Sequence, residues 1–365
     1  MKIGILTQYY RRNYGGILQS YAMFHVLRDM GHDVEIIDFR YNSKVNKTFA
    51  SYVEILRSKL TKHHSIKGNI SIRELPQEHL IAFDNFKKKY LKYSSMLTNN
   101  TIGDFVSDYD AIVVGSDQVW NNLTDRHLFY FFDFGKPYHG RRIAYAPCST
   151  VERIPFGVKR KLGRLLRQID DISVRDLTTQ KMVSTVSGIT PTIVLDPTVL
   201  YDYQEFQSPA IIKGDYVFAY ILGSEIRNGH TEVLNTIFGQ YGKMKVVAAI
   251  IPDTSLEVEK FADEIRYNAS PDEWINMVAN ARFVYTDSFH GCVFSMKFHK
   301  QFLAYYKDPD RASRLINLRK TYSIANIKGP DDTIELTTIN YDYVDSIVNK
   351  QKTASMQFLH NSFRI

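Results

Sequence analysis

Short apolar runs alternate with amphipathic segments in the first part of the chain. The run Lys2–Thr7 is followed by a glycine loop, then by Ile17–Met30 with apolar residues at helical spacing, and then by a second apolar run, Val34–Phe39. This order of strand, loop, helix and strand is typical of a βαβ unit. The two strands are therefore expected to pair in parallel through a right-handed crossover.

The same alternation continues through the rest of the chain. Apolar runs predict strands at 111–114, 142–146, 172–174, 192–195, 216–222, 245–250, 283–285 and 301–304. Amphipathic spacing predicts helices at 77–92, 156–169, 177–186, 231–240, 271–280 and 291–298, and a long closing helix at 341–363. Ser270 followed by Pro271 is typical of a helix N-cap with proline in the first turn.

The best candidate for a linker between the two halves runs from Asp196-Pro197 to Gly214. We therefore expect two Rossmann-like parallel-sheet α/β domains facing across a cleft, at 1–205 and 206–330. A C-terminal helical tail at 331–365 is expected to pack back on them. In such an arrangement the cleft between the domains is the expected place for a ligand.

Composition excludes several classes of protein. With 365 residues, 44% apolar and 23% charged, the chain is neither disordered, nor collagen-like, nor a small disulfide scaffold. No run approaches the roughly 18 uninterrupted apolar residues that a membrane span requires, and no signal peptide is visible. Two cysteines, Cys148 and Cys292, indicate a reducing compartment, so a cytoplasmic location is expected. Without a CxxC or HxxxH pattern, no metal site is expected.

The positive charge is concentrated in one segment. The chain has a net charge of +7, and residues 40–73 hold eight lysines and arginines against the single acid Glu54. Binding to nucleic acid is therefore not expected, and a local patch facing an anionic lipid surface or an acidic ligand is the better interpretation. A solvated surface without a partner is the alternative. The predicted helix from Phe156 is also basic and amphipathic, which is typical of a helix packed on a sheet or lying on a membrane.

Two segments of the first half place polar groups next to predicted strands. The segment 12–19 lies between a strand end and a helix N-terminus, where free backbone N–H groups favour an anion or a sugar hydroxyl; a tight turn is the alternative. The segment 115–121 follows the predicted strand at 111–114 and contains a carboxylate, amides and an indole, as in a carbohydrate site; a capping turn with the indole in the core is the alternative. The residues concerned are Asn13, Tyr14, Gly15, Gln19, Asp117, Gln118, Trp120 and Asn121.

Two further segments carry candidates for catalysis. Arg175 ends a predicted strand, where its guanidinium can hold a phosphate or a carboxylate; an ion pair with Asp176 or Asp171 is the alternative. His290 follows Ser288 and precedes Gly291 at a strand-to-helix junction. Histidine exchanges protons near neutral pH, so this position suits general acid–base catalysis, and a buried core histidine is the alternative. Arg311 and Arg314 form a second possible anion clamp on one helical face.

These motifs, in this order, resemble the polysaccharide pyruvyl transferase family over roughly residues 2–320. The resemblance rests on Asn-Tyr-Gly-Gly-Ile-Leu-Gln-Ser-Tyr-Ala, Gly-Ser-Asp-Gln-Val-Trp-Asn, Arg-Ile-Ala-Tyr-Ala, Ile-Ser-Val-Arg-Asp, Val-Leu-Asp-Pro-Thr, Asp-Ser-Phe-His-Gly and Arg-Ala-Ser-Arg-Leu. One departure is visible: small residues, Ser and then Gly, often follow Ala-Tyr-Ala in the family, whereas this chain has Pro147-Cys148-Ser149-Thr150. Cys148 is expected to pack rather than to act as a nucleophile.

The resemblance implies a fold similar to the GT-B glycosyltransferases and an enzyme that moves a pyruvyl group from phosphoenolpyruvate onto sugar hydroxyls as a ketal, releasing phosphate. It implies no cofactor beyond this donor substrate. The catalytic candidates are then His290 and Arg175. The donor-binding candidates in the C-terminal domain and at Arg175 are Arg175, Ser288, His290, Gly291, Arg311 and Arg314. The acceptor-binding candidates in the N-terminal domain are Asn13, Tyr14, Gly15, Gln19, Asp117, Gln118, Trp120 and Asn121.

The resemblance also implies where in the cell the enzyme works. Saccharide acceptors of this kind are commonly built on lipid carriers at the inner face of the cell membrane, which would explain the basic segment 40–73 as a peripheral contact with anionic lipid. The competing interpretation is a GT-B glycosyltransferase that uses a nucleotide sugar, with the glycine loop and the arginines serving a diphosphate.

Overall fold

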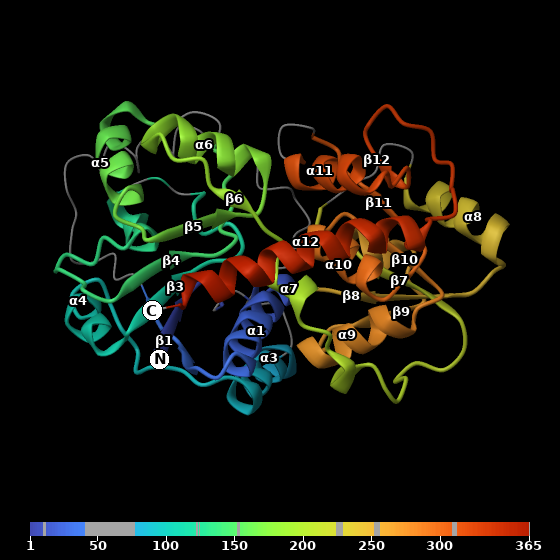
Figure 1. The fold of residues 1–365 in the computed structure, drawn as a ribbon. Coiled ribbons are helices and arrows are strands. Elements are labelled where there is room, and N and C mark those ends of the chain that lie inside the picture. The colour runs from blue at the N-terminus through green and yellow to red at the C-terminus, as the bar shows by residue number, and fades with distance from the viewer. Residues whose placement is uncertain are drawn as a thin grey trace, which may run out of the picture.

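Each half of the chain forms one six-stranded sheet in which all paired strands are parallel (Figure 1). The computed structural model describes residues 1–9, 12–40, 77–121, 123, 125–151, 154–223, 229–251, 256–308 and 312–364. The N-terminal sheet has the order β2-β1-β3-β4-β5-β6 and the C-terminal sheet the order β12-β11-β10-β7-β8-β9. The expected fold class, two parallel α/β lobes, is therefore confirmed.

The strands of the N-terminal sheet are β1 (Lys2–Leu6), β2 (Asp33–Ile36), β3 (Ala111–Val114), β4 (Arg141–Ala144), β5 (Asp171–Val174) and β6 (Thr192–Ile193). Those of the C-terminal sheet are β7 (Tyr216–Tyr220), β8 (Lys245–Ala249), β9 (Glu264–Arg266), β10 (Phe283–Thr286), β11 (Phe302–Tyr305) and β12 (Ile327–Lys328). The short strands β9 and β12 were not predicted, because each holds a single isoleucine beside charged residues and so contains no apolar run.

The helices of the N-terminal lobe are α1 (Tyr14–Asp29), α3 (Gln77–Tyr90), α4 (Ile102–Phe105), α5 (Phe156–Leu166) and α6 (Leu177–Ser187). The remaining helices are α7 (Pro197–Leu200), α8 (His230–Tyr241), α9 (Pro271–Asn280), α10 (Phe289–Lys297), α11 (Ser313–Tyr322) and α12 (Tyr341–Ser362). In Figure 1 the long helix α12 runs from the C-terminal lobe to the N-terminal lobe. There the Ser355 hydroxyl accepts a hydrogen bond from the Leu195 amide at 2.9 Å.

Helix starts follow the local sequence chemistry. The Ser270 hydroxyl accepts from the Glu273 amide, and the Glu273 carboxylate accepts from the Ser270 amide, with Pro271 in the first turn. The predicted N-cap is thus confirmed as a full capping box. The Asn13 side chain likewise accepts from the Gly16 amide and starts α1 at Tyr14, three residues before the first predicted helical residue.

A continuous apolar interface joins the lobes. The Tyr14 ring, at the start of α1, stacks on Trp274 of α9 with 5.4 Å between ring centroids, and its hydroxyl donates to the Ala269 carbonyl at 2.8 Å. Both rings are fully buried. This contact fixes the start of α1, and therefore the glycines that follow Tyr14, against the C-terminal lobe.

The stretch expected to be a plain linker contains a short helix. Asp196 ends the chain segment after β6, and its carboxylate caps α7 by accepting from the Thr198 amide at 3.0 Å. The chain then crosses to β7, which begins at Tyr216. Apart from Arg40, the basic segment 40–73 lies outside the described residues.

Candidate active site

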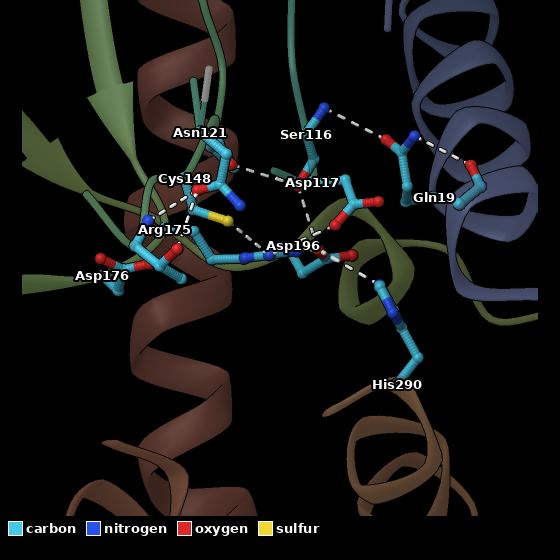
Figure 2. A network of polar contacts seen from close by, with 12 residues as sticks. Gln19, Ser116, Asp117, Asn121, Cys148, Arg175, Asp176, Asp196 and His290 are labelled. Atoms are coloured by element: carbon cyan, nitrogen blue, oxygen red, sulfur yellow. Dashed lines mark hydrogen bonds and ion pairs between the residues drawn. The ribbon is translucent and has the colours of Figure 1, made fainter. Parts of the chain in front are cut away.

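A buried carboxylate lies where the two lobes meet. Asp196 Oδ2 accepts hydrogen bonds from Arg175 Nη1 at 2.5 Å and from the Ser116 hydroxyl at 3.0 Å, while Oδ1 accepts from the Thr198 hydroxyl at 2.7 Å. Figure 2 shows this residue at the centre of the polar network, with His290 approaching from the C-terminal lobe. Asp196 is 3% exposed, so its charge is balanced by these partners rather than by solvent.

Arg175 reaches Asp196 from the end of β5. Its guanidinium also donates from Nη2 to the Cys148 sulfur at 2.7 Å and lies 3.6 Å from Asp117 Oδ1. The expected alternative, an ion pair with Asp176 or Asp171, does not occur: Asp176 caps α6 and Asp171 pairs with Arg141. Arg175 Nε is buried and has no hydrogen-bond partner among the described residues, so one donor of this guanidinium is unused.

His290 is held at the start of α10. The Ser288 side chain caps this helix by accepting from the Gly291 amide at 3.3 Å, so the imidazole projects from the first turn. His290 Nε2 lies 3.7 Å from Asp196 Oδ2 and has no hydrogen-bond partner among the described residues. On the other side of the ring, a Cβ added to Gly15 would lie 2.0 Å from Nδ1. Only glycine at position 15 therefore leaves room for this histidine.

Asp117 is the second carboxylate of the site. It has a left-handed backbone with φ of 63°, and its carbonyl accepts from the Cys148 amide at 2.9 Å, which anchors the loop after β3 on the loop after β4. Burial alone would raise the pKa of Asp117, but Arg175, His290 and Arg314 lower that pKa below its ordinary value. Asp117 is thus a carboxylate beside the Arg175 and Arg314 guanidiniums and the His290 imidazole, which come from both lobes.

At Asp196, burial and neighbouring groups also act on the pKa in opposite directions, and the neighbouring groups have the larger effect. Burial alone would raise its pKa, but the nearby His290 imidazole, the Arg175 charge and the Thr198 hydroxyl lower the pKa of Asp196 well below its usual range. Burial raises the pKa of the Cys148 thiol to about 12, so Cys148 is a neutral packing group and a hydrogen-bond acceptor, not a thiolate.

A cavity of about 480 Å³ opens beside this cluster between the lobes. Arg175, Asp196 and Arg314 line its polar end, and apolar residues of α10, α11 and α12 line much of the remainder. The Arg175 and Arg314 guanidiniums lie 4.6 and 5.5 Å from the centroid of the Phe289 ring. The predicted partner of Arg314 in an anion clamp, Arg311, lies outside the described residues.

The acceptor-binding role predicted for three residues is wrong, because their side chains are buried in other contacts. Trp120 is fully buried, stacks on Phe131 and donates its indole N–H to the Tyr130 carbonyl at 3.0 Å, so it cannot stack on a sugar. Tyr14 belongs to the lobe interface described above. The buried Gln19 amide accepts from the Ser116 amide at 3.1 Å and donates to Thr7 Oγ1 at 2.9 Å. Gln19 therefore holds Ser116 beneath Asp196 rather than facing a ligand.

Of the remaining candidates, some make packing contacts within the protein and others are half-buried. The Asn121 side chain accepts a hydrogen bond from the Thr150 amide at 2.6 Å. The loop 147–150, whose sequence differs from the family pattern, therefore packs on the loop that carries Asp117. Gly291 lies against Thr286. Asn13, Asp117 and Gln118 are half-buried. Among the described residues, no group of three or more His, Cys, Asp or Glu could hold a metal ion.

Asp196 itself was missed as a site residue. Its position directly before Pro197 gives it the sequence pattern of a linker start, and its partners Arg175, Ser116 and His290 are distant along the chain. The available signal was a single carboxylate following a strand of a parallel sheet, at the edge where ligands bind.

Comparisons with known proteins show which family the chain resembles. Residues 13–309 match the model of the family described as polysaccharide pyruvyl transferase. No curated protein matches the chain. Among solved structures, UDP-GlcNAc 2-epimerase from Methanocaldococcus jannaschii is 12% identical over 96% of this chain and 92% of that chain, with a TM-score of 0.46. The E. coli heptosyltransferase WaaC is 11% identical over 96% and 99%, with a TM-score of 0.45. At identities this low, similarity to these structures indicates the fold alone.

The family match covers most of the chain and includes every described residue of the cluster around Asp196 apart from Arg314. The chain belongs to the polysaccharide pyruvyl transferase family.

Proposed function

We propose that the protein transfers the pyruvyl group of phosphoenolpyruvate onto hydroxyls of a saccharide, forming a ketal and releasing phosphate. The observation that carries this proposal is the meeting of Arg175 from one lobe and His290 from the other on the buried carboxylate of Asp196, beside a cavity. A cleft enzyme that joins two substrates needs such a shared anchor, because the groups that bind each substrate then keep one geometry.

The charges of the cluster suit a small anionic donor. Phosphoenolpyruvate carries a carboxylate and a phosphate, and Arg314 at the cavity wall offers a half-buried guanidinium to one of them. The unused Nε of Arg175 and the unused Nε2 of His290 are buried donors that a bound anion would satisfy. Asp117 and Asp196 keep the resting cluster from being strongly cationic, so the empty site tolerates its buried charges.

His290 is the proposed general acid and base. Its imidazolium gives a proton to the methylene carbon of the donor, which becomes a methyl group and leaves a cation-like C2. A sugar hydroxyl attacks C2, and its proton passes to the imidazole. The C–O bond to phosphate then breaks, and a second hydroxyl attacks C2 and closes the ketal. The first hydroxyl's proton has restored the imidazolium, so the second hydroxyl's proton is taken up by the released phosphate, which leaves as hydrogen phosphate.

The acceptor is proposed to lie on the N-terminal side of the cluster. Asp117 and Gln118 follow β3 and are half-buried, and Asn13 is half-buried at the start of α1, so a carboxylate and two amides are available to sugar hydroxyls. We propose a cytoplasmic enzyme whose acceptor is a precursor of a cell-surface polysaccharide carried on a lipid. Within the described part of the chain, no helix has the length and apolar character of a membrane span.

An assay with two donors tests this proposal. The purified protein is incubated with phosphoenolpyruvate and a panel of saccharides bearing neighbouring diols, and inorganic phosphate is measured. A parallel series replaces the donor with nucleotide sugars and measures nucleotide release. We expect saccharide-dependent phosphate release and a product heavier by one pyruvyl ketal. Nucleotide release in the second series, with phosphoenolpyruvate unconsumed in the first, would establish a glycosyltransferase instead.

A further inference from the structure

We propose that the outer layer formed by α5 and α6 is a docking surface for an anionic lipid bilayer. The members of this α5–α6 surface are Phe156, Arg160, Arg164, Arg167, Leu177 and Lys181, all exposed. The surface does not depend on which donor the enzyme uses, so its test is independent of the proposed transferase reaction.

The two helices form one layer of the N-terminal lobe. They follow the neighbouring parallel strands β4 and β5, and right-handed crossovers place them on the same face of the sheet. They contact at their C-terminal ends, where Arg167 Nη1 donates to the Ser187 carbonyl at 3.5 Å. Since each helix leaves the carboxyl end of one parallel strand and returns to the start of the next, both helices begin on the side of the lobe where the strands end.

The apolar face of α5 is used by the core, so a membrane would have to meet its other face. Leu162, Leu165 and Leu166 are buried against the sheet. The opposite face places Phe156, Arg160 and Arg164 at successive i, i+4 positions, and α5 contains no acidic residue. The helix therefore presents a row of cations that begins with an aromatic ring.

Phe156 is 95% exposed and Leu177 61% exposed, at the starts of adjacent helices. Single exposed apolar residues are common on soluble proteins, but two beside a cationic row match the pattern of an interfacial membrane contact, in which apolar side chains insert and cations meet the headgroups. Leu177 also lines the cavity beside Arg175. Through Leu177, the α5–α6 surface therefore borders the cavity of the candidate active site.

The charge of the surface is not neutralised by neighbouring acids. Asp133 pairs with Lys161 at 2.9 Å, Asp171 with Arg141 at 2.7 Å, and Asp176 caps α6. Asp170 accepts from the Arg142 amide at 2.7 Å. Within the residues that the structure describes, Arg160, Arg164 and Lys181 have no carboxylate partner, so the surface complements an anionic bilayer.

Vesicle flotation with the full chain tests this surface. Wild-type protein is expected to float with vesicles of phosphatidylglycerol and phosphatidylcholine at low salt, to float much less at high salt, and not to float with pure phosphatidylcholine. The triple variant Phe156→Ser, Arg160→Glu, Arg164→Glu should lower the partition coefficient at least about tenfold, because each cation near the surface contributes to binding. Its thermal unfolding midpoint should stay near that of wild type, since all three side chains are exposed.

The matched control is the triple variant Ile81→Ser, Lys88→Glu, Lys89→Glu on α3, which also removes one exposed apolar side chain and reverses two exposed cations. It should float as wild type does. The proposal is overturned if the wild-type protein does not float, or if the α5 triple variant floats as well as the control, which would assign binding to another segment. The proposal is also overturned if the protein does not bind the vesicles but binds a homopolymeric RNA, and if the α5 triple variant loses the RNA binding.

Discussion

Replacing His290 with alanine is expected to lower turnover by about 10²–10⁴-fold while phosphoenolpyruvate still binds. The imidazole comes from the C-terminal lobe and lies 3.7 Å from Asp196, and a histidine side chain can give and take a proton near neutral pH. The donor keeps the Arg175 and Arg314 guanidiniums, so its dissociation constant should change far less than the turnover number. Phosphate release gives the turnover, and calorimetry gives the dissociation constant.

The matched control is His299→Ala, because His299 is an exposed histidine of the same lobe that pairs with Asp345 at 3.0 Å and lies apart from the cluster. That variant should turn over as wild type does. Circular dichroism of His290→Ala should match the wild-type spectrum. Wild-type turnover in folded His290→Ala would remove this histidine from the mechanism.

The Asp196→Asn variant is expected to lose both stability and activity. The amide matches the shape of the carboxylate but leaves the buried Arg175 guanidinium without its closest anion. Breaking a buried ion pair in this way lowers the free energy of unfolding by about 3–5 kcal/mol. Turnover should fall in the fraction that remains folded, because Arg175 and His290 lose the group that fixes their spacing. Urea denaturation and the phosphate assay measure the two effects.

The pH dependence separates this explanation from a simple packing defect. Since the folded protein holds the pKa of Asp196 well below its usual range, the stabilisation by this carboxylate is fully present above about pH 4 and is lost as the pH falls further. The difference in unfolding free energy between wild type and Asp196→Asn should therefore narrow below about pH 4. Asp202→Asn, in the same linker but exposed, should show neither effect. A constant difference at every pH would contradict the charge argument.

The sequence predicted the fold well because parallel α/β lobes are encoded by local patterns. Buried apolar strands such as Ala111–Val114 and Phe283–Thr286 read as strands whatever their neighbours are. The polar residues directly after these strands could also be placed, since the carboxyl ends of parallel strands meet at one edge. This is why Asp117 and Arg175, which follow strands of the same sheet, lie 3.6 Å apart, whereas His290 follows a strand of the other sheet and joins them only through the packing of the lobes.

Side-chain direction could not be predicted from the same patterns. Trp120 and Asp117 share one loop, yet the left-handed backbone at Asp117 directs the carboxylate to Arg175 while the indole packs in the core on Phe131. Gln19 lies on a helix that is buried on almost all sides between Tyr14 and Leu27, so its burial leaves no periodic signal. Asp196 depends on partners from three other segments, and such long-range pairing has no signature in a single sequence.

Calorimetric titration of phosphoenolpyruvate into the purified protein tests the central claim most directly. Saturable binding at a single site is predicted, with or without a saccharide, and the affinity should fall in Arg314→Gln, whose half-buried side chain can change without disturbing the Asp196 network. Absence of any binding heat by folded wild-type protein, both alone and with the saccharide panel, would contradict the assignment of this cluster to a phosphoenolpyruvate-dependent transferase.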